Sequence, residues 1–323
     1  MGDTNLFSTT QIVDPAQILS DAEIRAEEIT IRRLVFETPL DAMKWCARRK
    51  LLKNTCDCDN CNIPMTCSLN SRVVLDGYQW ICKLYKSQRS IRKNSFFENS
   101  ELSLEQILVL VCGWAMEYPQ DIISLEAQLG QGSKTVVDWY NFCREVCEVH
   151  FMQNEIVIGG LNEDCTSKTV DIDESKFFYK KYHQGRWVDG HWVFGGIERE
   201  SRKCFLVEVP DRTEATLAAI IERHILPGSI IVSDGWRAYG NIQDIGGSMY
   251  EHHAIIHHEN TGVFLQNLEN MWMRAKYRLQ RQFGTSEALF CSYLHDFVWR
   301  NQFPKSQVFA EFVIMVAAQF PVP

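Results

Sequence analysis

Apolar residues along the chain follow a helical period in the first half and a strand period after Thr169. In the first half, helical spacing covers residues 102–116, 121–129 and 133–149. Ser100 or Ser103, with Glu105 nearby, can cap the first of these helices, and Ser133 can cap the third. Gly130-Gln131-Gly132 forms a turn between the last two helices. The pattern predicts a helix-turn-helix, with an ordinary helical hairpin as the alternative.

The second half predicts a mixed sheet. Three strands are expected, joined by short polar turns, at 170–177, 191–197 and 204–209. An amphipathic helix at 214–224 ends before Pro227-Gly228, and a fully apolar fourth strand follows at 230–233. Three strands in a meander, then a helix and a fourth strand, is the order expected of an RNase H-like fold.

Two of the acidic residues at these strands are candidates for a metal site. Asp173 is in the middle of the first strand, and Asp234 directly follows the fourth. A bare buried carboxylate is costly, so each would need a cation or hydrogen-bond donors. One alternative is an edge strand with a solvated acidic face, which suits Asp171 and Glu174 better than Asp173. The alternative for Asp234 is an Asp-Gly turn.

A third acid opens a segment with helical period. Glu269, Trp272, Met273, Lys276 and Leu279 fall on one face of the expected helix. An acid, an indole and a base on one face are unusual for an apolar core, although a solvated acid near a helix start is the alternative. We expect Trp272 in the core rather than on a flipped base, and Lys276 at a phosphate. Three carboxylates would suit hard divalent cations and phosphoryl transfer.

Five short motifs follow one another along the second half of the chain. They are Asp173-Glu174-Ser175, Trp192-Val193-Phe194-Gly195-Gly196-Ile197-Glu198-Arg199, Pro210-Asp211-Arg212-Thr213, Ser233-Asp234-Gly235-Trp236-Arg237-Ala238-Tyr239 and Leu268-Glu269-Asn270-Met271-Trp272. From about Cys58 to Phe303 the chain resembles Merlin-type DDE transposases, eukaryotic relatives of a bacterial insertion-sequence group with an ISXO-like domain. The interval between Asp234 and Glu269 is also typical of that family.

The resemblance implies an RNase H-like catalytic domain that uses Mg²⁺ or Mn²⁺. Its catalytic and metal-binding residues would be Asp173, Asp234 and Glu269. The partners would be double-stranded DNA, namely transposon terminal repeats and target, and further copies of the chain in a homo-oligomer on DNA. The resemblance also implies a location in the nucleus.

A cysteine cluster resembles the N-terminal zinc ribbon of the same family. The expected zinc ligands are Cys58, Cys61 and Cys82. Four thiolates at two knuckles make a ribbon, but Tyr85 stands where the fourth cysteine is expected. Cys56 or Cys67 would supply the fourth sulfur, or the metal has been lost and the fold kept. Five other cysteines lie in apolar segments and predict buried free thiols in a reducing compartment, namely Cys112, Cys143, Cys147, Cys204 and Cys291.

Charge is distributed unevenly along the chain. The net charge is −8, yet residues 41–93 carry eleven Lys or Arg against four Asp or Glu. Local basic surface matters more for phosphate contact than the charge of the whole chain. The expected DNA contacts are Lys83, Lys86, Arg89, Arg92, Lys93 and Lys134. No apolar run reaches the roughly 18 residues that a membrane span needs, and the polar N-terminus does not resemble a secretory signal.

One segment departs from the family pattern. Some members carry an Asn-His pair after the fourth strand, where this chain has Ile256-His257. The surrounding residues include His252, His253 and His258. We expect a polar loop beside the active site, with zinc binding or proton transfer as the alternative.

Together these features predict a multidomain α+β chain. The expected parts are an N-terminal helical leader (1–50), a zinc-ribbon-like basic module (51–93), a helix-turn-helix DNA-binding module (100–150), an RNase H-like α/β catalytic domain (165–305) and a C-terminal tail (306–323). The expected function is a DDE transposase that cleaves and joins DNA by two-metal phosphoryl transfer. A transposon-derived DNA-binding regulator without catalysis is the alternative, favoured by Tyr85 and Ile256. An RNase H-like nuclease or resolvase would share the chemistry but not need the N-terminal modules.

Overall fold

The computed structural model divides the chain into two compact units, one of residues 1–146 and 303–323 and the other of residues 147–302. It describes residues 7–70, 72–130, 134–177, 180–181, 187–188, 190–255, 266–280 and 287–322. Among these residues, no helix is long and apolar enough to cross a membrane.

The first unit combines a small antiparallel sheet with helices. The sheet has the order β1-β2-β3-β4, with β1 at Ser8–Thr9, β2 at Thr66–Leu69, β3 at Tyr78–Ile81 and β4 at Gln88–Ser90. The helices are α1 Asp21–Ala26, α2 Pro39–Arg48, α3 Leu104–Ala115, α4 Gln120–Glu126, α9 Val308–Gln319 and the part of α5 (Lys134–Gln153) up to residue 146. Short 3-10 helices lie at Pro15–Gln17, Ile31–Leu34 and Lys305–Gln307. Asp76-Gly77 lies in the connection between β2 and β3.

Helix starts in this unit follow their capping residues. Ser103 caps α3 and accepts a hydrogen bond from the Gln106 backbone, while the Gln106 side chain accepts one from the Ser103 backbone. The capping box therefore uses Ser103 and Gln106 rather than Glu105. Val136, Tyr140, Cys143 and Val146 of α5 are buried, whereas Val137 is exposed. The expected cap Ser133 lies outside the described residues.

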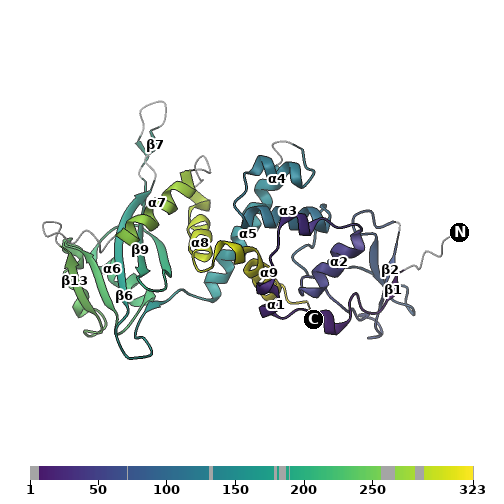
Figure 1. The fold of residues 1–323 in the computed structure, drawn as a ribbon, viewed down its shortest axis with the longest axis horizontal. Helices are drawn as coiled ribbons and strands as arrows, with labels where there is room; N and C mark the ends of the chain where they lie inside the picture. Colours follow the sequence, from purple (N-terminus) through teal and green to yellow (C-terminus); the bar gives the residue numbers. More distant parts are fainter. Residues whose placement is uncertain are drawn as a thin grey trace. The chain divides into compact units, whose positions relative to one another are not determined.

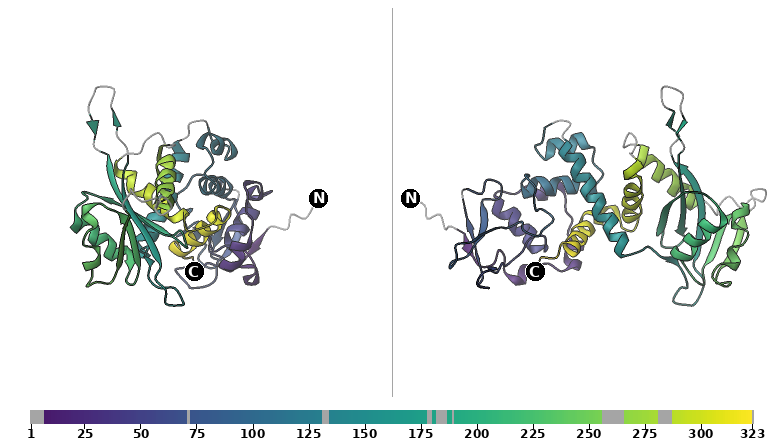
Figure 2. Two further views of the ribbon diagram at one scale, coloured as in Figure 1. Left: turned by 60° about the vertical axis from the view of Figure 1, so that its left-hand side comes forward. Right: turned by 180° about the vertical axis from the view of Figure 1, so that it is seen from behind.

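The C-terminal segment is part of the first unit, not a tail. Helix α9 buries most of its length, because residues 308–316 are almost entirely apolar. Phe312 packs against Trp114 of α3, with ring centroids 4.7 Å apart, and Glu311 accepts a hydrogen bond of 2.6 Å from Arg25 of α1. Figure 2 shows α9 in yellow beside the purple N-terminal elements. The predicted leader likewise packs into this unit, with Leu34 and Cys46 fully buried.

The second unit is built on a five-stranded mixed sheet with the order β10-β9-β6-β12-β13. Its strands are β6 Thr169–Phe177, β9 His191–Glu198, β10 Cys204–Val209, β12 Ile230–Asp234 and β13 Glu251–Ile255. The first three form an antiparallel meander, and β12 lies parallel to β6. This is the strand order expected of an RNase H-like fold. Minor pairs join β5 Ile158–Gly159 to β11 Ile225–Leu226, and β7 Lys180–Lys181 to β8 Trp187–Val188.

Helices cover both faces of this sheet (Figure 1). Helix α6, Glu214–His224, packs with Val170, Ile172 and Phe194 on one face. Helices α7 Gln266–Gln280 and α8 Phe290–Arg300 pack with Phe177, Val193 and Ile197 on the other. Alternate residues of each strand therefore enter two separate cores. Further 3-10 helices lie at Arg237–Tyr239, Ile242–Asp244 and Glu287–Leu289.

Candidate active site

Asp173 and Asp234 are brought together by the central strands. Strand β12 pairs in parallel with β6 up to Val232 opposite Asp171. Asp173 and Asp234 are each two residues beyond that last pair, on strands that run side by side, so their side chains project toward the same face. The negative charge of Asp234 acts on Asp173, which agrees with this placement. The two carboxylates therefore face one site at the carboxyl end of β12.

Helix α7 supplies a hydrogen bond to this site. The indole Nε1–H of Trp272 donates to Oδ2 of Asp173 at 3.1 Å. Trp272 is buried, which is the core position that we expected. It fits there because Gly195 on β9, the register partner of Asp173, has no side chain: a Cβ at Gly195 would lie 2.7 Å from Cη2 of Trp272. The glycine thus allows an indole to reach a carboxylate in mid-strand.

Asp173 is held in a desolvated, acidic environment. Burial is the main cause that raises the pKa of its carboxyl to about 7, and the charges of Glu174 and Asp234 raise it further. The bond from Trp272 opposes this shift but does not cancel it. A cation bound beside Asp173 would oppose the burial and the charge repulsion that raise this pKa.

Lys276 lies on the same side of α7, one turn after Trp272. Its Nζ is 5.4 Å from the ring centroid of Phe177. Burial lowers the pKa of this lysine, and the charge of Asp173 partly restores it. Lys276 is half-buried and faces the acidic site, whereas Met273, expected on the same face, is exposed.

Glu269 lies in the first turn of α7, one turn before Trp272, and is exposed. Among the described residues, the three acids do not form a group whose oxygens all lie within 4.8 Å of one another. The structure brings Asp173 and Asp234 together and places Glu269 on the helix that contacts Asp173.

The alternative of a solvated acidic face on β6 is wrong, because β6 is the central strand of the sheet. Asp171 is fully buried and accepts two hydrogen bonds from Arg199, at 2.7 and 2.9 Å. Glu174 points to the opposite face, where it accepts bonds from the Tyr239 hydroxyl and, at 3.1 Å, from Arg212. No sequence spacing indicated this network around Glu174, because its members come from three separate segments.

Oxygen ligands from Asp173 and Asp234 fit a hard divalent cation. Mg²⁺ prefers carboxylate oxygens, and the raised pKa of Asp173 marks a site where positive charge is lacking. Ser233 and His252 also lie close by: the serine hydroxyl is 2.8 Å from Nε2 of His252 and donates to the backbone oxygen of Asp234. His252 and His253 belong to strand β13 rather than to a loop, while Ile256, His257 and His258 lie outside the described residues.

In the first unit, three of the predicted zinc ligands converge. The sulfur atoms of Cys58, Cys61 and Cys82 lie within 4.8 Å of one another, and those of Cys61 and Cys82 are 3.7 Å apart. The Tyr85 backbone donates to the Cys82 sulfur at 3.3 Å, so the second knuckle keeps its turn without a fourth cysteine. Within the described residues, neither Cys56 nor Cys67 joins this group.

Cys67 lies inside strand β2, where burial raises the pKa of its thiol to about 12. The Cys56 thiol contacts Met65 and Arg89 instead of the cluster. All twelve cysteines are free, which agrees with the expectation of thiols rather than disulfides.

The six basic residues predicted to contact DNA differ in exposure. Lys83, Lys86, Lys93 and Lys134 are exposed, although Lys93 pairs with Glu98 at 2.8 Å. Arg89 pairs with Asp59 beside the cysteine cluster. Arg92 is only 4% exposed, so the prediction that it contacts DNA is wrong.

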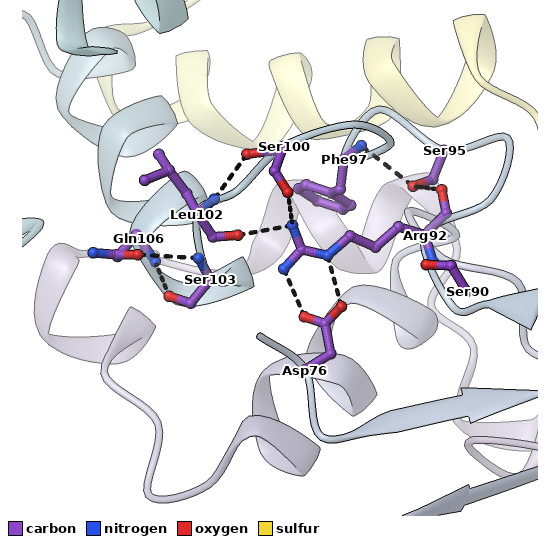
Figure 3. Close-up of polar contacts among 9 residues, drawn as sticks. All are labelled: Asp76, Ser90, Arg92, Ser95, Phe97, Ser100, Leu102, Ser103 and Gln106. Carbon is purple, nitrogen blue, oxygen red and sulfur yellow. Dashed lines mark hydrogen bonds and ion pairs between the residues drawn. The ribbon is translucent and has the colours of Figure 1, made fainter. Parts of the chain in front are cut away.

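Arg92 has a structural role instead. It donates to both carboxylate oxygens of Asp76, at 2.7 and 2.6 Å, and to the backbone oxygens of Ser100 and Leu102 (Figure 3). The guanidinium thereby joins the turn before β3 to the segment that enters α3. A fork of five donors suits such a position, because each partner lies in a different direction.

Comparisons with known proteins agree with the second unit's chemistry. Residues 170–302 match the family described as the ISXO2-like transposase domain. An uncharacterized transposase-like protein from Haemophilus influenzae is 34% identical over 111 residues, which is 33% of this chain and 88% of that protein.

Similarity to solved structures is weaker. The catalytic core of HTLV-2 integrase in complex with magnesium has 13% identity and a TM-score of 0.28, and covers 41% of this chain and 82% of that one. The catalytic core of BIV integrase has 15% identity and a TM-score of 0.27; the match covers 39% of this chain and 80% of the BIV integrase chain. The match to the family and the identity to the bacterial protein show that the chain belongs to the ISXO2-like transposase family.

Proposed function

We propose that the chain is a DDE transposase of the Merlin type, which cleaves DNA at transposon ends and joins it to target DNA. One observation carries the proposal: Asp173 and Asp234 share a desolvated acidic site, next to the helix that bears Glu269. Membership of the transposase family supports the same reading. The DNA partners would be terminal repeats and target, held by a homo-oligomer in the nucleus.

Each residue of the site has a distinct part in this proposal. Asp173, Asp234 and Glu269 would hold Mg²⁺ or Mn²⁺, which would activate the attacking oxygen and stabilise the leaving one. Trp272 fixes the orientation of the Asp173 carboxylate through its Nε1–H. Lys276 would contact a phosphate of the bound strand, because it lies one turn after Trp272 and the charge of Asp173 acts on it.

Cleavage of DNA is the direct test. The purified chain would be incubated with the DNA flanking its own gene, with Mg²⁺ or Mn²⁺, and strand cleavage and transfer would be measured. Asp173→Asn and Asp234→Asn should abolish cleavage, while DNA affinity stays nearly unchanged because most phosphate contacts lie elsewhere. Asp244→Asn, a change in an exposed 3-10 helix, is a matched control and should cleave normally.

The same assay separates the enzyme from a regulator. A chain that binds these ends but cuts neither strand, with either metal, would have lost catalysis and act as a transposon-derived DNA-binding protein. Cleavage that survives Asp173→Asn would contradict the assignment of this carboxylate.

We also propose that Cys58, Cys61 and Cys82 hold zinc in the first unit. The nearby basic residues would contact the DNA ends. The convergence of the three sulfur atoms supports this site. One zinc per chain is expected by metal analysis, and Cys61→Ser should lose it. Cys67→Ser, a change in the same sheet but away from the cluster, should retain it.

A further inference from the structure

Two indoles and a guanidinium form a stack at the edge of the catalytic sheet. The guanidinium carbon of Arg212 lies 3.8 Å from the ring centroid of Trp192 and 4.8 Å from that of Trp236. The Arg212 side chain is 37% exposed, and both indoles are half-buried. We call these three residues the stacking platform.

Two hydrogen bonds connect the platform to residues at or next to the candidate metal site. The Trp236 backbone donates to Oδ1 of Asp234 at 3.0 Å. Arg212 donates to Glu174, which follows Asp173 on β6 but projects to the opposite face of the sheet. The platform therefore contacts Asp234 through Trp236, and it lies at the same end of the strands as Asp173.

The sheet explains why three distant segments meet there. Strands β10 and β12 both run parallel to β6, so the residues that follow them, Arg212 and Trp236, leave the same edge of the sheet. Trp192 lies at the start of antiparallel β9 and reaches that edge from the opposite direction. In open sheets this is the edge where ligands are received.

We infer that the stacking platform binds unpaired nucleotides of the DNA strand next to the scissile phosphate. The inference rests on the proposed function, because it takes a phosphodiester to lie at Asp173 and Asp234. The nucleotides beside that phosphate must then pass over the adjoining surface. An indole face and a guanidinium plane both stack on bases of any sequence, and the cation complements the backbone charge.

The alternative role for Arg212 is to position Glu174 and nothing else. Arg212 keeps 37% of its side chain exposed while it pairs with Glu174, so it is accessible at the surface. Tyr239 already holds Glu174 from the protein interior. The indoles are thus placed where an unpaired base can reach them.

Binding without catalysis tests the inference. Two duplexes of the same arbitrary sequence would be compared in EDTA, one blunt and one with a short unpaired extension that carries 2-aminopurine. The wild-type chain should bind the extended duplex about tenfold more tightly, since one base on an aromatic ring contributes that much, and should quench the 2-aminopurine.

The variants address the platform residue by residue. Trp192→Leu and Trp236→Leu keep apolar packing on the core but remove the rings, and should lose both the preference and the quenching while blunt duplex binds as before. Arg212→Lys keeps the charge and should weaken the preference. Arg223→Ala, a change at an exposed arginine that pairs with Glu155, is the control and should behave as wild type.

The outcomes separate this inference from the proposed function. Equal affinity of the wild type for both duplexes, or a preference that both Trp variants retain, would overturn the stacking platform even if the chain cuts DNA. A preference lost in the Trp variants would support the platform even if no cleavage is found with Mg²⁺ or Mn²⁺. In that case the proposed transposase activity would be contradicted, and the stacking platform would be retained.

Discussion

Arg92 and Lys86 belong to the same basic stretch, yet their surroundings give them different roles. Arg92 and its partner Asp76 are both buried, whereas Lys86 is exposed at a turn with a φ of 55°. Burial without a partner is costly for either charge, so the two must remain together. A basic residue near a DNA-binding surface is therefore not necessarily a DNA contact.

Removing one partner of this buried pair should unfold the first unit readily. Arg92→Ala or Asp76→Ala leaves an unpaired buried charge, which costs about 3–5 kcal/mol. Lys86→Ala should leave the free energy of unfolding within about 0.5 kcal/mol and weaken DNA binding. Denaturant titration with DNA-binding measurements checks both. Arg92→Ala with normal stability and weakened DNA binding would contradict the structural role.

His224 should make the stability of the second unit depend on pH. Its ring stacks on Phe205, with centroids 4.9 Å apart, and Nδ1 lies 2.7 Å from the backbone oxygen of Ile156. Burial lowers its pKa below 6.5, so the unfolded chain takes up a proton first as the pH falls. The stabilisation is complete above about pH 6.5 and is lost below it.

The measurement is the unfolding free energy at pH 7.5 and 5.5 for the wild type and His224→Gln. The wild type should lose up to about 1.4 kcal/mol more than the variant per pH unit below 6.5. The carboxylates titrate in both chains and cancel in the comparison. Equal losses would mean that His224 has an ordinary pKa.

Sequence context made Asp173 and Asp234 candidates, because a carboxylate at an apolar strand needs a cation or hydrogen-bond donors. It could not assign Arg92 or Glu174, since their partners come from distant segments: Arg92 pairs with a residue 16 positions away, and Glu174 with one 65 positions away. Pairing over such separations depends on the folded backbone and has no local signal.

At the scale of elements, the close approach of α7 to β9 depends on Gly195, because a larger residue there would meet Trp272. Gly195→Ala would place a Cβ 2.7 Å from both Leu206 and Trp272. Overpacking of this kind costs about 1–3 kcal/mol. It would also displace the indole from Asp173, so cleavage should require more Mg²⁺ as well.

Metal titration of cleavage and denaturant unfolding would check these two effects of Gly195→Ala. Gly235→Ala is the stability control, because a Cβ there meets nothing within 4 Å. Gly195→Ala with unchanged stability would show that α7 moves away from the sheet at little cost.

Periodicity predicted four of the five strands in the sheet of the second unit, but it did not predict β13. Strands β6, β9, β10 and β12 and helix α6 agree with their predicted ranges within one residue at each end. Strand β13 was missed because its sequence, Glu-His-His-Ala-Ile, is polar and lies at the edge of the sheet. An edge strand with mostly exposed side chains lacks the apolar signal that marks a buried one.

At the scale of the whole molecule, the first unit depends on both ends of the described chain. Deleting residues 308–319 would remove the partner of Trp114 and of Arg25. The first unit should then lose protection from hydrogen exchange, while residues 147–302 keep theirs. Glu311→Gln, which breaks the ion pair alone, should have a small effect because Arg25 is 43% exposed. Unchanged exchange in the first unit after the deletion would contradict this dependence.

The return of the chain to the first unit has a consequence for its synthesis. The residues of the second unit follow residue 146 and precede α9, so a ribosome needs roughly 8–30 s to translate them. Throughout that interval α1 and α3 wait without their last packing partner, and their apolar side chains are open to chaperones or to other nascent chains. A message that stops anywhere before α9 therefore yields chains whose N-terminal unit lacks this packing partner.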